Sequence, residues 1–263
     1  MTKLGYKSRK WDKEMANLCK YKEILGEGYN RQIDTIILNS EKNSDYFWMC
    51  ASLTEAYETL AQLYLTENNN EKVVENIYLS IASFFTLYRM NRIVVPTQYV
   101  HAGNVLSKIE YAICKAIKIG CYDEFLDCYD NTIMGKLFSG NLKDAKKLIE
   151  KLPDLDSKAI DVYYIKPQFL KSIYYALIDK DEHLFVDELS KRIKKYRSNM
   201  VGYSTIIDYS TIALIKTAKL YGINVHFDIA EVPLFLMEQI NKEFVTPLKI
   251  PFQDNIEKMY KLI

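Results

Sequence analysis

The sequence predicts an all-α protein, and three observations support this prediction. Apolar residues recur with helical spacing along several long stretches of the chain. Strand signals are few, because only 92–96 (RIVVP) and 224–228 (NVHFD) read as short extended runs and no glycine-rich turn joins neighbouring alternating runs. Apolar residues make up 49% of the chain and charged residues 26%, which is typical of a folded protein with a sizeable core.

The clearest helical pattern is a pair of long stretches separated by a polar turn. The first stretch covers 43–68, with Ser44 as the expected N-cap, and its apolar stripe consists of Tyr46, Cys50, Leu53, Tyr57, Leu60, Ala61 and Tyr64. The second covers 71–92, and its stripe consists of Val74, Ile77, Tyr78, Ile81, Phe85 and Tyr88. Two long helices joined by so short a turn are expected to lie antiparallel.

Further along the chain, Pro96 and its β-branched neighbours predict an extended connector over 93–100. Helical patterns then follow in 103–120, 121–140, 141–153, 168–180, 181–199 and 212–221. We expect about ten helices packed as antiparallel hairpins, either in a bundle or in a degenerate helical-repeat array. No linker rich in proline, glycine or serine divides the chain, so one domain over 1–263 is predicted, with a possible weak seam at 153–166.

The last of these helices ends in a distinctive way. Gly222 can adopt the left-handed conformation that terminates a helix. Ile223, Val225 and Phe227 are then expected to fold back as an apolar clasp on the preceding helices. Pro233 is expected to start another short helix. The ending is therefore predicted to lock the C-terminal part of the fold.

Charge and cysteine usage limit the classes of partner and compartment. Lysines and arginines number 35 against 34 acids, so a net charge of +1 favours neither nucleic acid nor an anionic membrane as a partner. No apolar run is long enough to span a bilayer, and the N-terminal stretch does not read as a secretory signal. Five cysteines without a CxxC pair are typical of a reducing compartment. We expect a cytoplasmic protein with no membrane association.

Common catalytic and phosphate-binding motifs are missing from the sequence. His183 is interpreted as a surface histidine near a helix start, and a structural hydrogen bond is a better reading of His226 and Asp228 than catalysis. The cysteines and histidines are not spaced along the sequence as the ligands of a zinc ion usually are. No enzymatic activity, metal or cofactor is expected.

Two charged clusters are candidates for contact with a partner. Asp123, Glu124, Asp127 and Asp130 place four carboxylates on one face of a predicted helix, where they repel each other and invite a basic partner. A solvated acidic face near a helix N-terminus is the alternative. The basic run 191–197 (KRIKKYR) could bind phosphate, but Asp187 and Glu188 precede Lys191 and Arg192 at the spacing that neutralises charge within a helix.

The C-terminal part of the chain carries an ordered pattern of three segments. An acid-marked turn opens a long amphipathic helix in 176–193, a small-residue helix ends in Gly-Ile-x-Val within 208–228, and a proline-containing apolar end follows in 232–237. In this pattern the chain resembles the immunity protein 49 family, predicted neutralisers of bacterial polymorphic toxins. Upstream, 75–90 and 103–130 look more loosely like the paired central helices of that family.

The resemblance implies a cytoplasmic immunity protein that binds a cognate secreted toxin and occludes its active or functional surface. It implies no catalytic motif, because an inhibitor of this kind acts by occupancy. Two alternatives stay open. One is a helical-repeat adaptor or peptide-sensing regulator, although 1–42 offers no convincing helix-turn-helix. The other is an enzyme of unrecognised type, for which a closed pocket with perturbed ionisable groups would be the sign.

Overall fold

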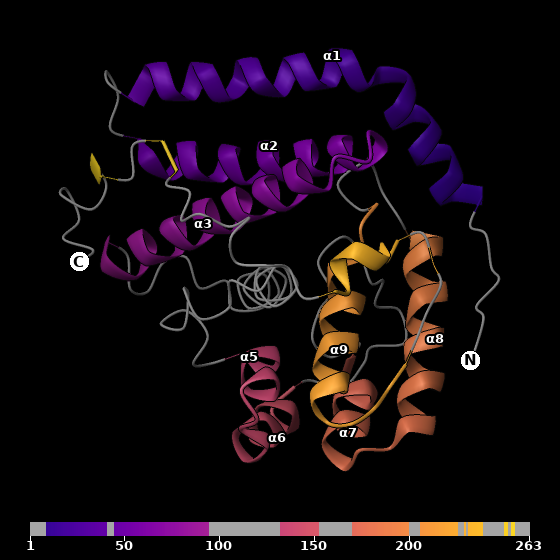
Figure 1. Cartoon of the computed structure of the whole chain (residues 1–263). Helices are drawn as coiled ribbons and strands as arrows, with labels where there is room; N and C mark the ends of the chain where they lie inside the picture. Colours follow the sequence, from indigo (N-terminus) through magenta and orange to yellow (C-terminus); the bar gives the residue numbers. More distant parts are fainter. Residues whose placement is uncertain are drawn as a thin grey trace. The chain divides into compact units, whose positions relative to one another are not determined.

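The computed structural model describes residues 9–40, 45–94, 132–152, 170–199, 206–225, 229, 231–238, 250–251 and 254–255. Eight α-helices and one short 3-10 helix lie in these ranges, and no described residue forms a strand (Figure 1). The all-α prediction is therefore confirmed. The elements are α1 (Arg9–Ser40), α2 (Tyr46–Thr66), α3 (Asn70–Val94), α5 (Ile133–Phe138), α6 (Leu142–Glu150), α7 (Lys171–Asp179), α8 (Glu182–Asn199), α9 (Tyr209–Leu220) and the 3-10 helix η4 (Leu234–Leu236).

Contacts within the chain divide it into two compact units. The first unit combines Met1–Glu14 with His101–Gln239, and the second combines Met15–Val100 with Ile240–Ile263. The seam expected at 153–166 lies outside the described residues. The prediction of one domain over 1–263 depends on how the two units are joined, and it therefore stays a prediction.

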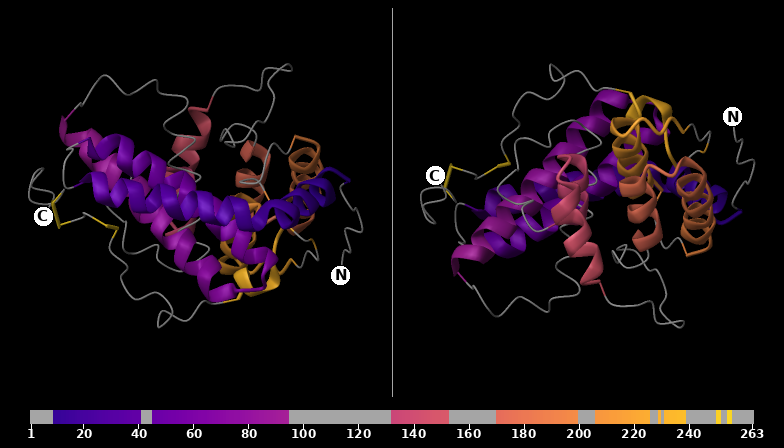
Figure 2. Two further views of the ribbon diagram at one scale, coloured as in Figure 1. Left: turned by 90° about the horizontal axis from the view of Figure 1, so that it is seen from above. Right: turned by 90° about the horizontal axis from the view of Figure 1, so that it is seen from below.

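The second unit is built on the antiparallel hairpin of α2 and α3, which lie side by side in every view (Figures 1 and 2). Asp45, rather than the expected Ser44, caps α2, because its Oδ1 accepts a hydrogen bond from the backbone N–H of Trp48 at 3.2 Å. The turn after α2 places Asn68 at a φ of 55°, a left-handed conformation that asparagine tolerates well. The predicted hairpin and its turn are confirmed.

The interior of this hairpin contains most of the predicted apolar stripes; Tyr64 is half-buried, and the side chain of Tyr88 lies outside the described residues. Leu53, Ile77 and Phe85 are fully buried. Burial raises the pKa of the Cys50 thiol to about 12, so at neutral pH this side chain behaves as a small apolar group. Ser80 is buried as well, and its hydroxyl donates to the backbone carbonyl of Thr54 across the hairpin at 3.0 Å.

The connector expected over 93–100 is partly wrong, because α3 continues to Val94. Val94 is two residues before Pro96, and proline disfavours helical backbone only at the residue immediately before it, so the helix can continue to Val94. The β-branched residues Ile93 and Val94 are therefore part of the helix. The prediction of an extended run over 92–96 is wrong for 92–94.

The long helix α1 was not identified from the sequence. It runs without interruption from Arg9 to Ser40, so no helix-turn-helix break occurs within it. Along the part that belongs to the second unit, Leu18, Ile33 and Ile36 are buried. An ion pair of 3.9 Å between Lys22 and Glu67 joins α1 to the end of α2.

The first unit is a series of short helices that contact their neighbours in sequence. α5 contacts α6, α6 contacts α7, and α7 contacts α8, while α9 contacts α5. The hydroxyl of Tyr221, just after α9, donates a hydrogen bond to the backbone carbonyl of Leu137 in α5. This bond ties together elements that are far apart in the sequence. None of the described helices is long and apolar enough to span a lipid bilayer.

The ending of α9 agrees with the predicted clasp in its described residues. Gly222 has a φ of +82°, and the backbone N–H of Ile223 donates to the carbonyl of Ala218 at 3.0 Å, as in a Schellman cap. Ile223 and Val225 are buried, whereas Phe227 lies outside the described residues. Pro233 stands immediately before η4, as expected for a residue that opens a short helix.

Two glycine substitutions are expected to change stability in opposite directions. Gly222→Ala should lower the free energy of unfolding by about 1 kcal/mol, because an L side chain disfavours a left-handed φ. Gly26→Ala should raise it by roughly 0.5 to 1 kcal/mol, because Gly26 lies inside α1 and an added Cβ would meet no atom within 4 Å. Urea unfolding followed by circular dichroism measures both, and a loss of stability in Gly26→Ala would contradict the continuous helix.

Candidate partner-binding surface

The acidic quartet expected to contact a partner, Asp123, Glu124, Asp127 and Asp130, lies outside the described residues. His226 and Asp228 lie outside them as well. The assignment of the quartet to a partner contact therefore stays a prediction. The described residues do locate His183, the basic run and the segments that carry the family resemblance.

His183 is exposed in the first turn of α8, in agreement with its interpretation as a surface residue. Among the described residues, no cluster of three or more histidine, cysteine or acidic side chains could hold a metal ion. Cys19 is exposed and Cys50 is buried, so the two described cysteines occupy different environments. The described part of the chain thus offers no set of side chains with metal-ligand spacing.

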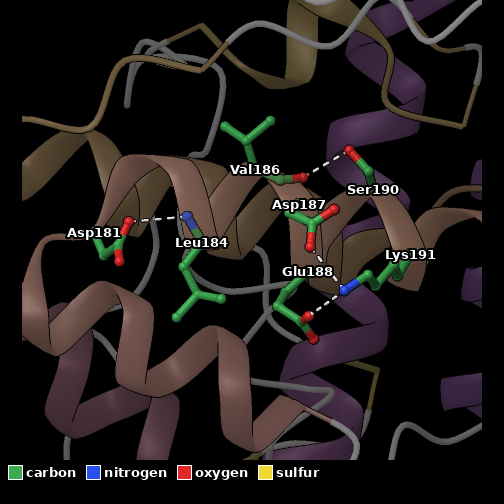
Figure 3. Close-up of polar contacts among 7 residues, drawn as sticks. All are labelled: Asp181, Leu184, Val186, Asp187, Glu188, Ser190 and Lys191. Carbon is green, nitrogen blue, oxygen red and sulfur yellow. Dashed lines mark hydrogen bonds and ion pairs between the residues drawn. The ribbon is translucent and has the colours of Figure 1, made fainter.

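The basic run begins with a lysine whose charge is satisfied within its own helix. Lys191 Nζ lies 2.7 Å from Asp187 Oδ2 and 2.7 Å from Glu188 Oε1 (Figure 3). The hydrogen bond from Lys191 holds the pKa of Asp187 below its usual value, and the two carboxylates raise the pKa of Lys191. This cluster stabilises α8 locally, so Lys191 is a poor candidate for a phosphate contact.

Arg192 does not follow the intrahelical pattern expected for it. Its side chain is 3% exposed, and its Nη2 lies 3.5 Å from Oδ1 of Asp208, which is 1% exposed. Glu188, four residues before Arg192, instead pairs with Lys191. The expectation that Glu188 would neutralise Arg192 is wrong, because Arg192 lies on the side of α8 that faces the protein interior.

Asp208 connects several parts of the first unit. Its Oδ1 accepts from the backbone N–H of Thr211 at 3.1 Å, and its Oδ2 accepts from the Thr211 hydroxyl at 2.6 Å, so it caps α9. Its own backbone N–H donates to the carbonyl of Glu231 at 2.9 Å. With the ion pair to Arg192, this one buried residue connects α8, α9 and the segment before η4.

The three segments that carry the family resemblance thus have clear structural roles where they are described. The acid-marked turn contains Asp181, whose Oδ1 accepts from the backbone N–H of Leu184 at 2.9 Å and caps α8 (Figure 3). The small-residue helix is α9, and all of its residues from Tyr209 to Ala218 except Lys216 are buried. In the apolar end, Val232 and Leu236 are buried while Leu234 is 52% exposed.

Sequence reasoning missed one charged surface that the structure describes. Lysines gather on the exposed face of α6, a helix that buries Ala145 and Ile149. The signal was present in the segment NLKDAKKLIEK at 141–151, where lysines recur at spacings of three and four residues between the apolar positions. It was read as a helix without regard to the charge of its outer face.

Comparison with known proteins identifies no relative: no family model matches the chain, and neither a curated protein nor a solved structure does. The resemblance to the immunity protein 49 family therefore stays a prediction that rests on the three C-terminal segments.

Proposed function

We propose that this chain is an immunity protein, which binds a cognate secreted bacterial toxin and neutralises it by covering its active or functional surface. The observation that supports the proposal most directly is the ordered pattern of segments over 176–237. A protein of this kind works by occupancy, so its affinity depends on how well its surface is preorganised. It would act in the cytoplasm, without a cofactor.

The packing of the described part of 176–237 favours such preorganisation. Caps at Asp181 and Asp208, the Gly222 clasp and the buried pair of Arg192 with Asp208 each restrict the backbone of the segment. A surface held in this way loses little conformational entropy on binding a partner, and tight binding is what a neutraliser needs.

Co-expression tests the proposal directly. The gene adjacent to and upstream of this one is inspected for a secreted multidomain toxin, and its C-terminal effector domain is produced in cells with and without this chain. We expect growth to stop without the chain and to be restored with it, together with a stoichiometric complex on gel filtration. A neighbouring locus without a toxin, or no rescue by a soluble chain, would contradict the proposal.

The acidic quartet provides a second test of the same function. If the toxin is a basic nuclease, the four carboxylates would take the place of phosphate charge, and changing Asp123, Glu124, Asp127 and Asp130 to alanine should weaken binding by at least about tenfold. The variant should also show a weaker dependence of affinity on salt. Circular dichroism should show unchanged helical content.

A matched control changes four acids that are exposed on described helices, namely Asp12, Glu23, Asp34 and Glu55. The control removes the same net charge, so it separates a local contact from a general charge effect. Equal losses of affinity in the two variants, or unchanged protection by the quartet variant, would exclude the quartet as a contact.

A further inference from the structure

The middle of α1 lacks the buried side chains that hold the helix on either side of it. Leu18 is fully buried before this stretch, and Ile33 and Ile36 are buried after it. No residue from 19 to 32, which we call the central segment of α1, is buried. The side chains that continue the inward stripe through the central segment are only half-buried, namely Lys22, Leu25, Tyr29 and Gln32.

Two glycines weaken the helix in the central segment. Neither Gly26 nor Gly28 has the positive φ that would favour glycine, and a Cβ added at either position would meet no atom within 4 Å. Neither the backbone conformation nor the packing therefore requires a glycine here. Each glycine lowers the equilibrium between helix and coil about fivefold relative to alanine, so the pair lowers it about 25-fold.

The ion pairs of the central segment offset little of this loss. Lys22 pairs with Glu67 at the end of α2 at 3.9 Å, and both side chains are 42% exposed. Arg31 pairs with Glu27 within α1 at 3.7 Å, and both side chains are 75% exposed. Within the described parts of the chain, the central segment makes no other ion pair. Pairs as exposed as these contribute little to stability, because water screens them.

The helix α2, in the same unit, has the opposite character. Every residue of α2 from Ala56 to Leu63 is buried. The backbone of α2 can open only when these side chains lose their contacts, whereas the central segment of α1 gives up few contacts when it opens. The backbone hydrogen bonds of the central segment should therefore break in smaller and more frequent openings than those of α2.

We propose that the central segment of α1 is a built-in opening segment, which loses its helical structure locally while Leu18, Ile33 and Ile36 stay packed on either side of it. Opening the middle of a helix breaks several hydrogen bonds, so the open form is a minor state. In this state the inward side chains of Leu25 and Tyr29 are released from their partial burial. The α2–α3 hairpin stays folded. This inference does not depend on the proposed function.

Hydrogen–deuterium exchange of the full chain, followed by mass spectrometry, tests the inference. The protection factors of peptides that cover 22–32 are compared with those of peptides that cover 57–63 in α2, without urea and at a low urea concentration. We expect protection in 22–32 to be at least about tenfold lower. It should also change little with urea, because a local opening exposes little surface, whereas protection in 57–63 should fall.

Two variants test the role of the glycines. The combined substitutions Gly26→Ala and Gly28→Ala should raise protection in 22–32 about 25-fold, because alanine favours the helix at both positions. Thr35→Ala is the matched control, since Thr35 is exposed on α1 and also gains helix propensity, but it lies beyond Ile33 and outside the central segment. It should change protection in 22–32 by less than about twofold if the opening is local.

Several results would overturn the inference. Protection in 22–32 equal to that in 57–63, or equally sensitive to urea, would mean that the central segment opens only when the whole unit unfolds. Unchanged protection in the variant with two alanines would mean that the glycines do not control the opening. A rise of about threefold in Thr35→Ala would mean that α1 opens as a whole.

Discussion

Replacing Asp208 by alanine is expected to lower the free energy of unfolding by about 3 to 5 kcal/mol. The carboxylate is 1% exposed and lies 3.5 Å from the guanidinium of Arg192, which is itself buried. Its removal would leave a buried cation without that countercharge, in a region where water cannot replace it. The same substitution removes the hydrogen bonds to Thr211 that cap α9.

A matched control separates the two effects of this substitution. Asp181 caps α8 through one oxygen, 2.9 Å from the backbone nitrogen of Leu184, but it is exposed and has no described ion pair. Asp181→Ala should therefore cost only about 1 kcal/mol, the usual value of a cap. Asp208→Asn keeps a capping oxygen and removes the charge, so its cost should lie between the two.

Urea unfolding with circular dichroism measures all three variants, and the midpoint and slope are fitted together. A loss in Asp208→Ala no larger than the loss in Asp181→Ala would mean that the pair with Arg192 contributes nothing to stability. Replacing both Arg192 and Asp208 by apolar residues provides the complementary measurement. It should be far less damaging than Asp208→Ala, because neither member of the pair is left buried without the other.

Arg192 shows which parts of this fold the sequence could predict. The spacing of Leu53, Ile77 and Phe85 predicts buried helix faces, because helical periodicity depends only on near neighbours in the sequence. The partner of Arg192 lies at position 208, beyond the end of α8. Rules for residues three or four positions apart do not include such a contact, so they assigned Arg192 to Glu188.

Two other differences between the predicted and the observed structure have local causes. Ser44 and Asp45 are both good capping residues, and the choice between them depends on which residue begins the helix, a boundary that periodicity locates only approximately. In α1, the buried positions Leu18, Ile33 and Ile36 are widely separated, and Gly26 and Gly28 interrupt the pattern between them. A long helix whose surface is largely exposed leaves only a weak apolar signal.

From the sequence, surfaces that could contact a partner can be predicted only as patterns of charge. Four acids at helical spacing or four lysines at helical spacing can be read from the chain. The burial of Ala145 and Ile149, which turns Lys143 and Lys147 of α6 outward, depends on packing against other helices. The sequence also does not distinguish Lys191, which is paired within α8, from Lys143 and Lys146, which are not paired in the described residues.

Replacing Lys216 by methionine is expected to stabilise the protein at neutral pH by up to about 3 kcal/mol. Lys216 belongs to α9, where its neighbours Ile215 and Thr217 are buried. Desolvation lowers the pKa of Lys216 from 10.5 to about 8, with a smaller contribution from the charge of Lys219. The folded state therefore disfavours the charged amine, whereas methionine keeps the apolar stem and removes the charge.

The pH dependence of this effect identifies its cause. Below pH about 8 the amine is charged in both states, so the destabilisation by Lys216 is fully present. Between pH about 8 and 10.5 the unfolded state binds more protons than the folded state, so this destabilisation fades as the pH rises. The raised pKa values of Cys50 and Tyr57, both about 12, lower stability at high pH in the wild type and the variant alike.

The difference in unfolding free energy between Lys216→Met and the wild type isolates the contribution of Lys216, because the other groups cancel. We expect this difference to be largest at pH 7 and to shrink steadily above pH about 8. Lys219→Met is the matched control, since Lys219 lies one turn later on α9 and is exposed, and it should change stability little at any pH. If the difference in unfolding free energy for Lys216→Met stayed constant with pH, the effect would come from packing of the side chain and not from desolvation of its charge.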